Sequence, residues 1–276
     1  MALCDFAIVE MLLAARADPN ATLTFPHHGC DSVITAIAND RADNLRKWLA
    51  RFPDWKIDQI LPVMGGGMTP LAFTCMLAGD KDCAAVLLER RADPNRRTNI
   101  GSFPLSLLCS QANAIPDLIE LLVHCRADVN QRMMVTNRVK RSAFAAIRMA
   151  YRTGARGHLF DRLAIGPGST ALSTAAFNGK LLQVETLLML RADAGIRNLQ
   201  QRTAFECASS NCGRQSTSLM LDLLNSDEPS VWADHRPEHH TSEAPPMSAR
   251  ASLVGIDAEE LVRSPADLDN VIPVEI

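Results

Sequence analysis

The stretch GMTPLAFTCMLAGDKDCAAVLLERRADPN, at Gly67–Asn95, contains the pattern that decides the fold. Thr69 and Pro70 mark a helix start, because a hydroxyl caps free backbone amides and Pro is preorganised for the first helical position. A short apolar run follows and breaks at Gly79. A longer amphipathic run then ends in two Leu residues and the polar phrase RADPN. The stretch therefore predicts a pair of helices closed by a polar turn.

The same polar phrase recurs along the chain. RADPN also stands at Arg16–Asn20, and the near copies RADVN and RADAG stand at Arg126–Asn130 and Arg191–Gly195, each after a Leu-Leu pair. The helix-start pattern recurs too, with GSFPL beginning 34 positions after Gly67 and GSTAL beginning 67 positions later again, which is about two periods. Such self-similarity indicates stacked copies of one helical hairpin. RADPN is thus interpreted as a repeated helix stop.

The periodic pattern sets the expected domain organisation. We expect an array over residues 1–225 of about six repeats, the first partial, beginning with a helix at Phe6–Ala15. Residues 134–167 are expected to be a degenerate repeat, whose clearest helix is Ser142–Arg152. Arg51–Met68 is expected to form an extended connection. Residues 226–276 are rich in Pro, Ser and acidic residues, which predicts a largely disordered acidic tail, with a short helix possible at Ile256–Val262.

These motifs resemble those of the ankyrin-repeat family. The resemblance rests on Thr-Pro-Leu at Thr69–Leu71, the Leu pairs, and Ala-Asp-x-Asn at Ala92–Asn95 and Ala127–Asn130, and it covers roughly residues 5–225. It implies an all-α fold: an ankyrin-type α-solenoid of stacked helix-turn-helix repeats with hairpin loops, followed by the tail. It also implies a non-catalytic protein-protein interaction scaffold or adaptor that binds a partner on its concave face.

The chain departs from the family pattern at two positions. The His that follows Thr-Pro-Leu is replaced by Ala72, Ser106 and Ser173, so the hydrogen bonds that it makes between repeats are expected to be missing. The Gly before Ala-Asp is always Arg, as at Arg91. A left-handed Arg costs on the order of 1 kcal/mol, against which a cation at a helix C-terminus contributes about 0.3–1 kcal/mol. We therefore expect a somewhat softer array.

The composition argues against a catalytic or metal-binding protein. The eight Cys form no C-x-x-C pair and several lie in apolar runs, so we expect reduced core thiols. No G-x-S-x-G elbow is present, and we expect no enzyme, metal, cofactor or small-molecule substrate. The N-terminus is not a convincing signal peptide and no uncharged apolar run is long enough to span a membrane. A soluble monomer is expected in the cytoplasm, with the nucleus as the alternative.

Charge is unevenly distributed along the chain. Residues 126–163 hold nine Lys or Arg against two acids, whereas the tail from Ser226 holds eleven acids against three Arg. This asymmetry favours attraction between tail and patch. The alternative function is therefore an electrostatic binder of nucleic acid or anionic lipid through segment 126–162, regulated by the tail. Its candidate basic patch comprises Arg132, Arg138, Lys140, Arg141, Arg148, Arg152 and Arg156.

The family resemblance also implies which positions touch a protein partner, namely the hairpin tips and the outward positions of the first helices. Carried over onto this sequence, the candidate partner-binding residues are Met68, Met76, Leu77, Asn99, Ile100, Ser102, Ser110, Gln111, Ser169, Phe177 and Asn178. Phe177, Met68 and Met76 attract most interest, because exposed aromatic and Met side chains make good interface anchors. Packing against the next repeat is the competing interpretation for all three.

Overall fold

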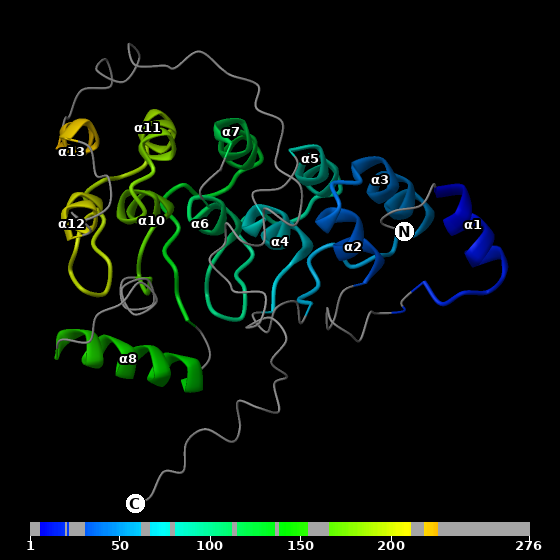
Figure 1. The fold of residues 1–276 in the computed structure, drawn as a ribbon, viewed down its shortest axis with the longest axis horizontal. Helices are drawn as coiled ribbons and strands as arrows, with labels where there is room; N and C mark the ends of the chain where they lie inside the picture. The colour runs from blue at the N-terminus through cyan, green and yellow to red at the C-terminus, as the bar shows by residue number, and fades with distance from the viewer. Residues whose placement is uncertain are drawn as a thin grey trace, which may run out of the picture.

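The helices of the protein form two rows in the computed structural model (Figure 1). The structure describes residues 6–19, 21, 31–61, 67–77, 81–111, 115–135, 138–153, 166–210 and 218–225. Within these ranges the regular elements are α-helices, with one isolated antiparallel bridge between Leu61 and Met68. The expected all-α solenoid is confirmed.

The first helix of each hairpin lies in an inner row and the second in an outer row (Figure 1). The inner row is α2 Ser32–Ala38, α4 Pro70–Met76, α6 Pro104–Leu108, α10 Ala171–Phe177 and α12 Ala204–Ser210. The outer row is α3 Ala42–Arg51, α5 Lys81–Glu89, α7 Pro116–His124, α11 Leu181–Met189 and α13 Ser218–Asn225. A single helix, α1 Phe6–Ala14, lies at the N-terminal end, and α8 Arg138–Arg152 lies outside both rows.

The inner helices begin as the sequence predicts. Thr69 Oγ1 accepts the Ala72 N–H at 3.2 Å, and Thr170 Oγ1 accepts the N–H of Ser173 at 3.2 Å. Asp31 caps α2 in the same way, since its Oδ1 accepts the Ile34 N–H at 2.8 Å. Each side chain satisfies one of the backbone donors that a helix start leaves without a partner.

The helices α1, α5, α7 and α11 end in the left-handed turn that the Arg substitutions imply. Arg16, Arg91, Arg126 and Arg191 have φ values of 63°, 63°, 71° and 62°. At Arg91 the N–H donates to the Leu88 carbonyl at 2.9 Å, and the next N–H, of Ala92, donates to Leu87 at 3.0 Å. These two hydrogen bonds form the Schellman motif, and their acceptors are the carbonyls of the Leu-Leu pair. The interpretation of RADPN as a helix stop is confirmed.

The Asn that closes the polar phrase joins neighbouring repeats. Asn95 Oδ1 accepts the Asp128 N–H at 2.7 Å, and its Nδ2 donates to the Arg126 carbonyl at 2.9 Å. Asn130 repeats the first contact by accepting the Asp193 N–H at 2.8 Å. The polar phrases are therefore linked edge to edge along the array.

The Asn130–Asp193 bond shows that the repeats on either side of residues 134–167 stack directly on each other. Consistently, α7 packs against α11, and α6 packs against α10. The degenerate repeat expected at residues 134–167 is therefore not part of the array, and these residues are an insertion between two stacked repeats. The helix of the insertion is longer than predicted, starting at Arg138 rather than Ser142. Among the described helices, none packs extensively against α8.

The insertion lies at the tip of a hairpin loop. In the preceding loop, the Thr98 N–H donates to the Ser102 carbonyl and the Gly101 N–H donates to Thr98. Met133 makes the matching bonds with Ser169 and Gly168, at 2.8 Å each. Three positions separate Thr98 from Gly101, whereas 35 separate Met133 from Gly168, so about 32 residues are inserted. Because this length is close to one period, spacing alone made the insertion resemble a repeat.

The core is built from Leu, Ile, Val, Ala and Cys packed between the two rows. Phe103, Leu71, Leu105, Leu118 and Leu172 are among its fully buried side chains. Cys75, Cys83, Cys109 and Cys207 are buried free thiols, as expected for reduced core cysteines. Apolar burial at roughly 25 cal/mol per Å² supplies the main driving force for stacking.

The two Ser residues at the family's His position bond locally. Ser106 Oγ accepts the Phe103 N–H at 3.1 Å and donates to the Phe103 carbonyl at 2.9 Å. Ser173 Oγ lies 3.2 Å from Thr170 Oγ1. Both hydroxyls are therefore used at their own helix start.

Candidate protein-binding surface

Four of the candidate residues lie half-buried at the C-terminal ends of the inner helices. Leu77 follows α4, Ser110 and Gln111 follow α6, and Asn178 follows α10. The polar ends are folded back onto their own helices: Ser110 Oγ donates to the Leu107 carbonyl at 2.7 Å, and Asn178 Nδ2 donates to Thr174 at 2.8 Å. Gln111 Nε2 donates to Ser110 Oγ at 3.1 Å. This end of the inner row therefore presents a preorganised polar edge.

The candidates in the hairpin loops divide by exposure. Asn99 is exposed and Ile100 is half-buried, whereas Met68, Ser102 and Ser169 are buried. The buried ones hold the loops together: Met68 exchanges two backbone bonds of 2.9 Å with Leu61, and the Ser102 and Ser169 carbonyls accept the loop-closing bonds. Of these five residues, Asn99 and Ile100 therefore offer the side-chain surface.

Phe177 and Met76 are buried at the ends of their helices. Phe177 is 7% exposed and packs against Cys207 of the next inner helix. Met76 belongs to the main core. Both side chains are therefore packed inside the array, as the competing interpretation predicts. Neither is an exposed anchor for a partner in this structure.

Two exposed apolar side chains occupy the tips of successive loops. Asn99, Met134 and Leu199 each stand eight positions after the left-handed Arg, and Met134 and Leu199 are 59% and 56% exposed. Their backbones are fixed by matching bonds to the preceding loop, such as the Asn99 N–H to Gly67 at 3.0 Å and the Leu199 N–H to Pro167 at 3.2 Å. Leu199 was not among the predicted residues, although counting from the polar phrase would have found it.

A row of Arg side chains ties these loops together. Arg97, Arg132 and Arg197 each stand six positions after the left-handed Arg. Arg97 Nη2 donates to the Arg132 carbonyl at 3.4 Å, and Arg132 donates through Nε to Gly168 at 3.2 Å and through Nη2 to the Arg197 carbonyl at 2.6 Å. The guanidinium groups of Arg97 and Arg132 therefore each reach the next loop, and the three loops form one continuous edge.

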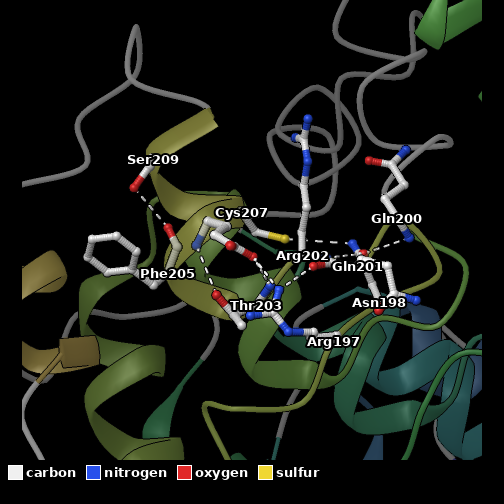
Figure 2. A network of polar contacts seen from close by, with 10 residues as sticks. Arg197, Asn198, Gln200, Gln201, Arg202, Thr203, Phe205, Cys207 and Ser209 are labelled. Carbon is white, nitrogen blue, oxygen red and sulfur yellow. Dashed lines mark hydrogen bonds and ion pairs between the residues drawn. The ribbon is translucent and has the colours of Figure 1, made fainter.

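Arg197, the last Arg of this row, holds the final described hairpin loop together (Figure 2). Arg197 Nη1 donates to the Gln201 carbonyl and to Glu206 Oε2, the latter at 3.2 Å. Glu206 also accepts the Thr203 N–H at 2.7 Å, and Thr203 Oγ1 accepts the Glu206 N–H at 3.3 Å, which is a capping box. The backbone N–H of Thr203, with Arg197 nearby, lowers the pKa of Glu206.

Buried polar contacts hold the same loop from below. Asn198 is 1% exposed, and its Oδ1 accepts the N–H groups of Gln200 and Arg202 at 2.9 and 3.0 Å. Its Nδ2 lies 3.7 Å from the Cys207 sulfur (Figure 2). Leu199 is therefore carried on a rigid loop, and rigid apolar groups lose little entropy on binding.

The predicted basic patch is split between the hairpin loops and α8. The Arg132 guanidinium is bound to the two carbonyls named above. In α8, Arg141 is exposed and Lys140 is half-buried. The side chains of Arg138, Arg148 and Arg152, and all of Arg156, lie outside the described residues, as does the tail from residue 226.

Burial shifts the pKa of three of the described thiols. Burial raises the pKa of Cys109 to about 12 and that of Cys207 to about 11, and it raises the pKa of Cys75 further, so these thiols stay protonated near neutral pH. Among the described residues, no group of three or more His, Cys, Asp or Glu is placed to hold a metal ion. No described helix is long and apolar enough to cross a membrane.

Comparison with known proteins agrees with the geometry. Residues 66–99 match the family model of the ankyrin repeat, whose members generally mediate protein-protein interactions. No curated protein matches the chain. The matched segment covers the α4–α5 hairpin, and the same hairpin, polar phrase and loop bonds recur on both sides of it. Residues 66–99 of the chain therefore form an ankyrin repeat, and the other described hairpins share its architecture.

Proposed function

We propose that the protein is a non-catalytic scaffold or adaptor that binds a partner protein along its loop tips and the adjoining inner-helix ends. The observation that carries the proposal is the placement of two large exposed apolar side chains, Met134 and Leu199, at equivalent tips of neighbouring loops. Exposed Met and Leu on a rigid support, with the exposed polar Asn99 at the equivalent position of the preceding loop, supply apolar side chains next to a polar one. That is the usual anatomy of a protein interface.

The described surface favours a protein partner over a small molecule. Affinity in such an array comes from contacts spread over several repeats, and the Arg row holds the loops in one fixed order. The Leu77 and Asn178 positions extend the surface along the inner row, so a partner that lies across several repeats would reach both.

Paired charge insertions test this function. The partner is captured from a cell lysate with wild-type protein and with Met134→Asp/Leu199→Asp. The matched control is Leu182→Asp/Met189→Asp, which puts two acids at exposed apolar positions of the outer helix α11. We expect a partner that is retained by wild type and by the α11 variant and lost by the loop-tip variant. Equal retention by all three, or loss by the α11 variant alone, would contradict the proposal.

A second candidate function uses the insertion. Electrostatic binding of nucleic acid or anionic lipid is favoured by one specific observation, the run Val129–Phe160, which contains seven Lys or Arg and no acidic residue. Binding to phosphates weakens steeply between about 50 and 200 mM salt. Retention of an unchanged affinity for DNA or for phosphatidylserine vesicles over that range would count against this candidate.

A further inference from the structure

The insertion places a helix beside the loop tips that no other described helix covers. α8 begins and ends within the stretch between Met133 and Gly168, and in Figure 1 it lies beneath the loops, with its axis along the array. The repeats before and after the insertion are joined by the hydrogen bond between Asn130 and Asp193, so α8 is not needed to connect them. In repeat proteins, insertions into such loops commonly belong to the binding face.

The sequence of α8 is electrostatically unfavourable for a helix in water. Its first turns contain Arg138, Lys140 and Arg141 and no acid, at the end of the helix where the macrodipole disfavours cations. Arg148 and Arg152 stand four positions apart, a spacing at which like charges repel. A helix of 15 residues without tertiary packing is marginal in water. An anionic cover would therefore stabilise α8 directly.

The cover must also offer apolar groups. Phe144 and Ile147, three positions apart on the helix, are half-buried. Arg141 and Met149 are exposed, and Met149 is 62% exposed. α8 is thus amphipathic and basic, which fits a ligand with acids and apolar side chains at helical spacing.

The chain carries a segment of that composition. Residues 253–262, LVGIDAEELV, contain Asp257, Glu259 and Glu260, and place Val254, Ala258 and Leu261 at helical spacing. The segment lies outside the described residues. It belongs to the stretch 226–276, with eleven acids against three Arg, so its charge complements that of α8.

Chain connectivity favours this occupant over a free acidic peptide. The stretch starts after α13, which lies at the same end of the array as α8 in Figure 1. A random-coil chain of about 30 residues has a root-mean-square span of about 30 Å, and a tether of that length gives an effective concentration of the order of millimolar. We infer that α8 is a docking helix for the chain's own acidic segment 253–262. This inference does not depend on the proposed loop-tip interface.

Hydrogen exchange of α8 in the full chain, followed by mass spectrometry, tests the inference. The variant Asp257→Lys/Glu259→Lys/Glu260→Lys reverses the segment's charge. The control Asp227→Lys/Glu228→Lys/Asp234→Lys makes the same change in net charge elsewhere in the tail. We expect slow exchange in α8 to be lost in the first variant and kept in the control, while exchange in α5 and α7 stays unchanged in both. Unchanged α8 exchange in the first variant, or equal loss in both, would overturn the inference.

A charge swap distinguishes direct contact from an indirect effect. Adding Arg141→Glu, Arg148→Glu and Arg152→Glu to the first variant should restore slow exchange in α8, and a failure to restore it would argue against direct contact. The wild-type chain is also measured with phosphatidylserine vesicles. If α8 becomes protected only when vesicles are added, a lipid surface rather than the segment is its cover, and the inference is overturned.

Discussion

Asn95 holds Asp128 across a repeat boundary, with its Oδ1 accepting the Asp128 N–H at 2.7 Å. The Asn95 amide also donates to the Arg126 carbonyl at 2.9 Å, and the Asn95 carbonyl accepts from Gln131 Nε2 at 2.9 Å. One side chain therefore satisfies a donor and an acceptor that face outward at the edge of the next hairpin. Asn130 repeats the contact with Asp193, so this bond is a regular joint of the array.

Replacing Asn95 by Ala should destabilise the protein. Two side-chain hydrogen bonds are lost, and each net bond is worth about 0.5–1.5 kcal/mol, so the free energy of unfolding should fall by about 1–3 kcal/mol. Urea denaturation followed by circular dichroism measures the change. Arg96→Ala, an exposed neighbour in the same loop, is the control and should stay within about 0.5 kcal/mol of wild type. An equal effect of both substitutions would show that the Asn95 contacts carry no particular stability.

Two substitutions of the left-handed Arg91 should differ in their effect on the free energy of unfolding. With φ at 63°, Arg91→Gly removes a steric cost of about 1 kcal/mol but loses a cation near the helix C-terminus, so it should leave the free energy of unfolding unchanged or slightly raised. Arg91→Val should lower it clearly, because a β-branched residue is poorly tolerated at positive φ. Thermal unfolding of both variants checks the order. A Val variant as stable as the Gly variant would contradict the backbone argument.

Asp31 should make stability depend on pH with an unusual sign. Burial raises the pKa of Asp31, although the N–H groups of Ile34 and Val33 act to lower it. Because the folded state binds this proton more tightly than the unfolded state, the contribution is present at low pH. It is lost as the pH rises from the ordinary Asp value through the raised folded pKa.

Asp31→Asn isolates that contribution, since the amide oxygen still accepts the Ile34 N–H. We expect the wild type to lose stability relative to the Asn variant as the pH rises from about 4 to 7. Urea denaturation of both proteins across this range measures the difference. A difference that is constant with pH, or that grows in favour of the wild type as pH rises, would contradict the burial effect.

Excising the insertion should leave the array folded. Deleting residues 135–166 joins Met134 to Pro167 and leaves a turn of the same length as Asn99–Gly101, so that Met133 keeps its bonds to Gly168 and Ser169. The neighbouring hairpins stay joined through Asn130 and Asp193. Circular dichroism and the unfolding midpoint should therefore be close to those of wild type. Loss of cooperative unfolding would show that the insertion is part of the core.

Local chemistry made the hairpins predictable. The Thr69 cap, the Pro at the helix start and the polar phrase after each Leu pair act within a few residues, and all appear where the sequence placed them. The left-handed Arg could be predicted for the same reason. The polar phrase ends the helix in a left-handed turn, so an Arg at the position of the usual Gly must adopt a positive φ.

Longer-range features were harder to predict. The insertion imitates a repeat because its length is close to one period, and only the Met133–Ser169 pairing reveals where it starts and ends. Phe177 is buried because Cys207, thirty positions further on, covers it. Both features depend on a partner residue about 30 or more positions away, which periodicity alone does not position.

The Asn130–Asp193 joint also bears on the order of folding. Most neighbouring hairpins meet across about 35 residues, as Asn95 and Asp128 do, whereas this pair must close a loop of 63. Loop-closure entropy makes that junction about 0.5 kcal/mol harder to form than its neighbours. Nucleation should therefore proceed separately on the two sides, with α2–α7 as one cooperative block and α10–α13 as another, and the seam between them should be the first place to open under mechanical or chemical stress.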